Sequence, residues 1–138
     1  MRVVVIGGTG HIGSYLSPAL VEAGHEVVCV SRGQRDPYQA HEAWKQILRV
    51  ALDRPVEEAA GSFGQRVADL RPDVVIDLTC YFLPSAEHLV NALRGRVQHF
   101  LHCGTIWVHG FSVEVPTTED APREIGRASC RERVSYHV

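Results

Sequence analysis

Three glycines recur at three-residue intervals directly after the first apolar run of the chain. They are Gly7, Gly10 and Gly13, within the stretch Gly-Gly-Thr-Gly-His-Ile-Gly. After a buried strand, such glycines allow a tight turn, let the backbone approach a phosphate and let the next helix pack closely. The first turn of that helix also presents N–H groups and a partial positive charge to an anion. The spacing therefore predicts a cradle for a pyrophosphate, with a glycine-rich turn that binds no ligand as the alternative.

The glycine loop has the pattern G-x-x-G-x-x-G, which differs from the G-x-G-x-x-G of many dehydrogenases. A P-loop is excluded because no Gly-Lys-Ser or Gly-Lys-Thr follows the glycines. The loop residues predicted to contact a dinucleotide are Gly7, Gly10, His11, Ile12 and Gly13.

Ser31 and Arg32 follow the second apolar run, residues 26–30. Sites that prefer NAD usually carry Asp or Glu there, which accepts hydrogen bonds from the ribose hydroxyls. A carboxylate would repel a 2′-phosphate, whereas the planar fork of a guanidinium suits one. Both residues are therefore predicted to bind the cofactor, and Arg32 favours NADP over NAD. A solvated arginine at a strand end is the alternative.

Alternating strands and helices must position these residues. Short β-branched runs predict strands, and residues 12–23 and 83–93 repeat apolar side chains at helical spacing. Residues 56–70 predict a further helix, which Gly61 and Gly64 weaken. The predicted strands are 2–6, 26–30, 46–52, 74–78 and 98–103. This alternation indicates an α/β fold of the Rossmann type, a doubly wound parallel sheet with the strand order 3-2-1-4-5.

The composition fits one domain of 138 residues with a net charge of −2. No basic block indicates nucleic acid binding, and no apolar run approaches the roughly 20 residues that cross a bilayer. The N-terminus lacks the longer apolar stretch of a signal peptide, and the four cysteines form no C-x-x-C pair. We therefore expect a cytoplasmic protein without disulfides, membrane contact or a nucleic acid partner.

The last residue of the fourth predicted strand and the residues after it should face a ligand, since ligands bind beyond the carboxyl ends of parallel strands. Leu78, Thr79 and Cys80 are therefore predicted to line the nicotinamide side of the site. A metal is not predicted, although His99, His102, Cys103 and His109 lie close in sequence. Strand alternation places neighbouring residues on opposite faces, and no pair has the spacing of a structural zinc site.

The segment V-V-V-I-G-G-T-G-H-I-G resembles the extended and atypical short-chain dehydrogenases/reductases, in the group of NAD-dependent epimerases and dehydratases. The resemblance covers about residues 1–123. It implies an NAD(P)-dependent oxidoreductase, epimerase or dehydratase that transfers a hydride at a carbon bearing a hydroxyl or carbonyl. It also implies a small-molecule substrate of the nucleotide-sugar type and a homodimer. The alternative is a non-catalytic member, such as a dinucleotide-binding sensor or an RNA-binding relative.

The resemblance assigns roles to two residues outside the glycine loop. Residues 102–110 resemble the family's S-S-x-x-V-Y-G segment, which makes Thr105 the catalytic hydroxyl that hydrogen-bonds the substrate oxygen. His109 stands where that segment carries tyrosine, which leaves the substrate class open. Asp53 resembles the family's acidic residue near the adenine amino group. An N-cap of the helix that begins near Pro55 is the equal alternative for Asp53.

The end of the chain departs from this resemblance. Residues 116–122 resemble the P-x-x-E-D-x-P stretch that precedes a Y-x-x-x-K motif in relatives, and no such motif follows. The string I-G-R-A-S-C-R-E-R-V resembles a translated sequencing adapter. We therefore interpret residues 124–138 as a non-native tail, with a native polar tail as the alternative. Residues 1–123 are expected to form a dinucleotide-binding domain truncated on its C-terminal side, which lacks turnover by itself.

Overall fold

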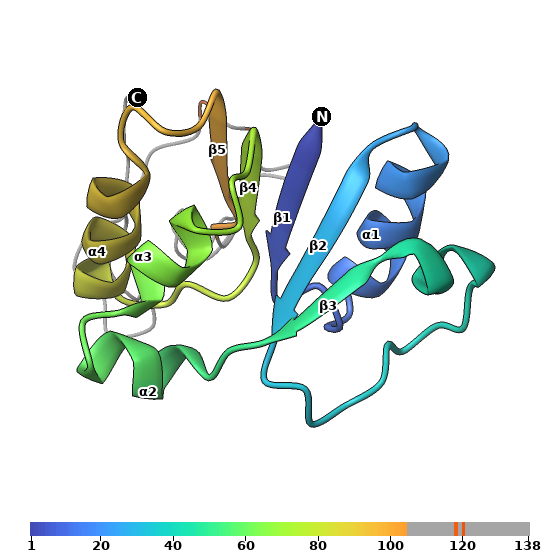
Figure 1. The fold of residues 1–138 in the computed structure, drawn as a ribbon, viewed down its shortest axis with the longest axis horizontal. Helices are drawn as coiled ribbons and strands as arrows, with labels where there is room; N and C mark the ends of the chain where they lie inside the picture. The colour runs from blue at the N-terminus through green and yellow to red at the C-terminus, as the bar shows by residue number, and fades with distance from the viewer. Residues whose placement is uncertain (105–117, 119, 121–138) are drawn as a thin grey trace.

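Five parallel strands form the centre of the molecule. The computed structural model describes residues 1–104, 118 and 120, and its sheet has the order β3-β2-β1-β4-β5 (Figure 1). The strands are β1 (Arg2–Ile6), β2 (Glu26–Ser31), β3 (Leu48–Ala51), β4 (Val74–Asp77) and β5 (His99–His102). The central strand β1 pairs with β2 on one side and with β4 on the other. The predicted Rossmann-type fold and strand order are therefore confirmed.

Helices cover both faces of this sheet (Figure 1). They are α1 (Gly13–Glu22), α2 (Arg54–Ala59), α3 (Phe63–Ala68) and α4 (Leu83–Leu93), with a 3₁₀ helix, η1 (Glu42–Gln46), before β3. α1 and η1 pack against one face, and α3 and α4 pack against the other. Within the described residues, no helix is both long enough and apolar enough to cross a membrane.

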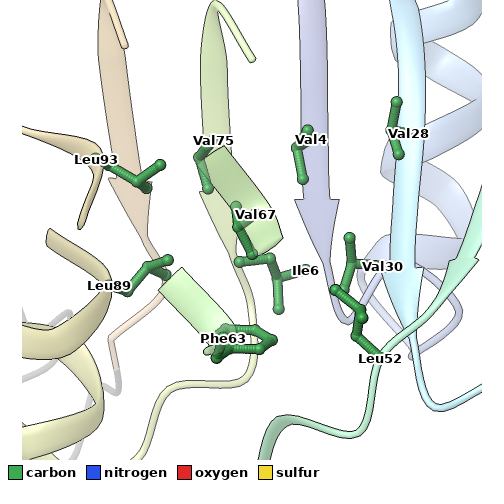
Figure 2. Packing of buried hydrophobic residues seen from close by; sticks show 10 residues of the cluster. All are labelled: Val4, Ile6, Val28, Val30, Leu52, Phe63, Val67, Val75, Leu89 and Leu93. Atoms are coloured by element: carbon green, nitrogen blue, oxygen red, sulfur yellow. The ribbon is translucent and has the colours of Figure 1, made fainter. Parts of the chain in front are cut away.

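Alternate side chains of β1 enter two separate hydrophobic clusters. Val4 and Ile6 pack in the cluster under α3 and α4, which includes Phe63 (Figure 2). Val3 and Val5 point to the opposite face and pack in the cluster under α1 and η1. None of these four β1 side chains is more than 3% exposed. Each such burial stabilises the fold by roughly 1.5–3 kcal/mol, so β1 holds the start of the glycine loop firmly.

The prediction of one continuous helix over residues 56–70 is wrong. The structure has two short helices there, because α2 ends at Ala59 and α3 begins at Phe63. Between them Gly61 has a φ of +71°, a left-handed conformation that ends a helix. The break lets α3 turn its buried residues Phe63 and Val67 toward the sheet.

The third predicted strand is shorter at its start than expected. Residues up to Gln46 form η1, and the strand begins at Leu48. His41 caps η1, since its Nδ1 accepts the N–H of Ala43 at 3.2 Å. This local hydrogen bond turns the chain before it reaches the sheet. The other predicted strands agree with the structure to within one residue at each end.

Candidate functional site

A cavity of about 530 Å³ opens at the carboxyl ends of the central strands. Its walls come from the ends of β1 and β2, the segments that follow β2, β3 and β4, and the glycine loop. The cavity lies where the strand order reverses, since β1 stands between β2 and β4. Ligands of open α/β sheets bind at this point, and the volume lies within the range of small-molecule sites.

The glycine loop forms one wall of this cavity and leads directly into α1. A Cβ on Gly13 would lie 2.5 Å from the backbone of Gly8, so only a hydrogen atom fits there. A Cβ on Gly10 would lie 3.2 Å from the carbonyl oxygen of Gly7, and Gly10 lines the cavity. α1 has no side-chain cap at Ile12 and no acidic residue in its first turn. Its positive end therefore faces no competing carboxylate within the helix and suits an anion.

The structure brings five of the predicted contact residues together around the cavity. These residues are Gly7, Gly10, Ser31, Arg32 and Thr79. The remaining predicted contacts lie outside its lining, namely His11, Ile12, Gly13, Asp53, Leu78 and Cys80. Thr105 lies outside the described residues. The ligand roles of all these residues stay predictions.

Asp53 caps α2. Its Oδ1 accepts the N–H of Val56 at 3.5 Å, and Pro55 occupies the first turn. A short polar side chain before a proline is a typical start of a helix, because it satisfies a backbone donor that has no partner within the helix. Of the two interpretations of Asp53, this geometry supports the N-cap, and its contact with adenine stays a prediction.

A buried ion network lies beside the cavity, at the start of α2 and the end of β4. Arg54 donates from Nη1 to both carboxylate oxygens of Asp77, at 3.0 and 2.9 Å. Its Nε donates to Oε1 of Glu58 at 2.6 Å. Ser85, in the first turn of α4, donates its hydroxyl to Oε2 of Glu58 at 2.7 Å. The network thereby ties α2 to β4 and α4.

The charges of this network are well shielded from water. Asp77 is fully buried, and the side chains of Arg54 and Glu58 are only 12% and 20% exposed. Burial lowers the pKa of Arg54, but the charge of Asp77 and the hydrogen bond to Glu58 raise it, so the net pKa lies above its ordinary value. Arg54 therefore stays charged and balances Asp77.

Sequence reasoning missed Arg54, Glu58 and Asp77. One signal was present, because Asp77 is a lone acid in the apolar run 74–78. A charged residue in a buried strand requires a partner. The sequence did not reveal which cation would fill that role, since Arg54 lies 23 residues away in the chain.

Asp77, Cys80 and His102 place one metal-ligand atom each within 4.8 Å of one another. Arg54 already contacts both oxygens of Asp77, so a cation would have to compete with its guanidinium. Burial also raises the pKa of the Cys80 thiol, whereas metal binding requires a thiolate. The charges around this cluster therefore disfavour a metal.

Cys29 lies in β2, under the glycine loop. It is fully buried, and a Cβ on Gly8 would lie 2.5 Å from its Sγ. Burial raises the pKa of Cys29 to about 11, against smaller lowering effects from Arg49 and the backbone of Gly8. The thiol is therefore neutral near physiological pH and acts as a packing group.

This thiol should make stability depend on pH in the alkaline range. The folded state keeps the proton up to a pKa of about 11, whereas the unfolded chain releases it near the ordinary value of 9.0. Stability is therefore lost as pH rises from 9 toward 11. We expect the wild type to lose about 2–3 kcal/mol more than Cys29→Ala over this interval. Urea unfolding of both proteins across this range measures the difference, and parallel pH curves would contradict it.

A family model described as the NAD dependent epimerase/dehydratase family matches residues 3–129. The chain belongs to this family. The match spans the glycine loop, all five strands and the residues around the cavity. The resemblance inferred from the glycine loop is therefore confirmed.

Individual relatives of this epimerase/dehydratase family member are longer than the chain. The 2′-dehydrokanamycin reductase of Streptomyces kanamyceticus is 33% identical over 119 residues, which cover 86% of this chain and 32% of that protein. Epimerase family protein YfhF of Bacillus subtilis (strain 168) is 22% identical over 130 residues, covering 88% and 43%. The chain therefore spans less than half the length of these two curated relatives.

Solved structures share the fold of this family member. UDP-glucose 4-epimerase from Bifidobacterium longum, in complex with NAD⁺ and UDP, aligns with a TM-score of 0.70 and 20% identity. The alignment covers 90% of this chain and 43% of that one. WbmH of Bordetella bronchiseptica, in complex with NAD⁺, aligns with a TM-score of 0.65 and 21% identity, covering 89% and 45%. At these identities the likeness establishes the fold alone.

Proposed function

We propose that this chain forms the dinucleotide-binding part of an NAD(P)-dependent oxidoreductase, epimerase or dehydratase that acts at a hydroxyl or carbonyl carbon. One observation carries the proposal: the glycine loop, which leads directly into α1, lines a cavity where the strand order reverses. Membership of the epimerase/dehydratase family supports it, as do the NAD⁺ complexes of the two aligned structures.

The residues around the cavity suit a dinucleotide in extended form. Gly10 has no side chain to block a pyrophosphate, and the positive end of α1, which follows the glycine loop, would attract it. Ser31 and Arg32 would hold the adenosine ribose, and Thr79 would contact the nicotinamide side. When bound, the nicotinamide ring supplies or accepts a hydride.

The substrate side of the site is proposed from the family. Thr105 would hydrogen-bond the reacting oxygen of the substrate. A nucleotide-sugar-like substrate is supported by the UDP bound to the epimerase of Bifidobacterium longum. The homodimer and the cytoplasmic location stay predictions of the sequence.

Arg32 makes NADP the preferred cofactor in this proposal. It is exposed and lines the cavity, and neither Ser31 nor Arg32 at the end of β2 is a carboxylate that would repel a 2′-phosphate. In Arg32→Ala, we expect the affinity for NADP to fall about tenfold or more and the affinity for NAD to change less than about twofold. Isothermal titration calorimetry with both cofactors measures the two affinities.

Arg94→Ala is a matched control for this experiment, because Arg94 is also exposed but lies outside the cavity lining. It should leave both affinities unchanged. If the wild type binds NAD more tightly than NADP, the assigned preference is incorrect. If it binds neither cofactor, the proposed dinucleotide site is incorrect.

A further inference from the structure

The segment 32–38, between β2 and η1, forms one wall of the cavity. Arg32, Gly33, Gln34, Arg35 and Tyr38 all line it. The segment crosses from the end of β2 to the glycine loop, so it borders both the ribose side and the pyrophosphate side of the proposed cofactor site. Its position therefore determines where its two arginines stand relative to a bound dinucleotide.

One end of this segment is held by Ser14, the second residue of α1. The Ser14 hydroxyl accepts the backbone N–H of Tyr38 at 2.9 Å and donates to the carbonyl oxygen of Thr9 at 3.3 Å. Ser14 is 1% exposed and is not part of the cavity lining. The ring of Tyr38 also contacts the ring of His11, with centroids 4.0 Å apart. A single buried hydroxyl thus joins the glycine loop to segment 32–38.

The middle of the segment is held independently by Arg49 of β3. Arg49 donates from Nη1 to Oδ1 of Asp36 at 3.2 Å and from Nη2 to the carbonyl oxygen of Arg35 at 3.3 Å. Its side chain is 41% exposed, so these bonds are accessible to water. The segment is therefore fixed from α1 and from the sheet edge before any ligand binds.

The two arginines of the segment both line the cavity. Among the described residues, no hydrogen bond or ion pair engages the guanidinium of Arg32 or of Arg35. Asp36, the one acid of the segment, pairs with Arg49 and lies outside the cavity lining. Glu58 is the one carboxylate in the lining, and it is engaged by Arg54. The wall formed by segment 32–38 is therefore cationic.

We propose that Ser14 is a positioning residue for the 2′-phosphate of NADP, acting through segment 32–38 on Arg32 and Arg35. This inference rests on the proposed function. An ordered segment binds with a smaller entropy loss than one that must be fixed by the ligand. Loss of the Ser14 hydroxyl leaves the Tyr38 N–H without its partner and weakens the hold on this end of the segment, where the ring contact with His11 remains. Arg32 and Arg35 would then be held less firmly in the cavity wall, while the glycine loop contacts needed for either cofactor would persist.

The test compares affinities for NADP and NAD by isothermal titration calorimetry on the full chain. In Ser14→Ala, we expect the affinity for NADP to fall about five- to tenfold and that for NAD to change less than about twofold. Arg49→Met removes the second anchor at an exposed site and should reduce the same selectivity, which keeps the test decisive if Ser14→Ala does not fold. Ser17→Ala is the matched control, since Ser17 is a fully buried serine of α1 whose hydroxyl has no partner among the described residues.

The outcomes separate this inference from the function on which it rests. Equal losses of NADP and NAD affinity in Ser14→Ala would indicate a merely structural role and overturn the proposal. Unchanged NADP selectivity in both Ser14→Ala and Arg49→Met would also overturn it, even if Arg32→Ala abolishes the selectivity. If Arg32→Ala leaves the selectivity intact, the assigned NADP preference and the role of Ser14 both fail.

Discussion

Replacing Gly13 by alanine should destabilise the protein by about 3 kcal/mol and abolish measurable binding of a dinucleotide. The new Cβ would lie 2.5 Å from the C, Cα and O atoms of Gly8. Backbone atoms cannot rotate away as the end of a side chain can, so α1 must move away from the strand it follows. This displacement would distort the glycine loop, whose residues Gly7 and Gly10 line the cavity. Urea unfolding measures the loss of stability, and calorimetry with NADP and NAD measures binding.

Gly10→Ala is the informative comparison for Gly13→Ala. Its Cβ would meet only the Gly7 carbonyl oxygen, at 3.2 Å, and Gly10 does not have a positive φ. We therefore expect a stability change below about 1 kcal/mol, because a small shift relieves the contact. Dinucleotide affinity should still fall, since the added methyl group stands in the cavity lining. Wild-type stability in Gly13→Ala would contradict the close approach of α1 to the glycine loop.

Replacing Arg54 by methionine should destabilise the protein by about 3–5 kcal/mol. The substitution keeps an extended side chain but leaves the fully buried Asp77 without its cation. Glu58, which lines the cavity, loses the same partner, so both carboxylates are left without their shared cation. Removal of one member of a buried ion pair is costly because the remaining charge keeps its desolvation penalty. The midpoint of urea unfolding, with the slope checked for constancy, measures this loss.

Arg66→Met is the matched control for Arg54→Met. Arg66 also pairs with a glutamate, Glu57, but its side chain is 52% exposed. Solvent screening should therefore limit its loss to less than about 1 kcal/mol. The double variant Arg54→Met with Asp77→Asn should recover part of the stability, because the uncompensated charge is removed. Equal effects of the two arginine substitutions would show that burial does not strengthen the network.

The sequence by itself determined the sheet, its strand order and the position of the glycine loop. These features depend on local patterns, because a buried parallel strand needs a continuous apolar run such as Val3 to Ile6. The spacing of the glycines is also a local feature of the sequence. Because glycine has no side chain, Gly13 can approach the backbone of Gly8 closely. The helix predicted over 56–70 was wrong because apolar periodicity continued across Gly61, while the backbone there turned left-handed.

Only the tertiary structure decided which side chains meet at the cavity. Arg54 finds Asp77 across 23 residues, and Ser14 finds the Tyr38 N–H across 24. No local period encodes such pairs, since they exist only when the sheet brings the ends of separate strands to one edge. The sequence placed Arg32 at the end of a strand, but only the structure shows that Arg35 lines the same wall of the cavity. It also shows that Ser14 and Arg49 hydrogen-bond the backbone of that segment. Long-range packing therefore decided which side chains line the predicted cofactor site and which residues hydrogen-bond to them. Such partners are determined by distance in space and not by spacing along the chain.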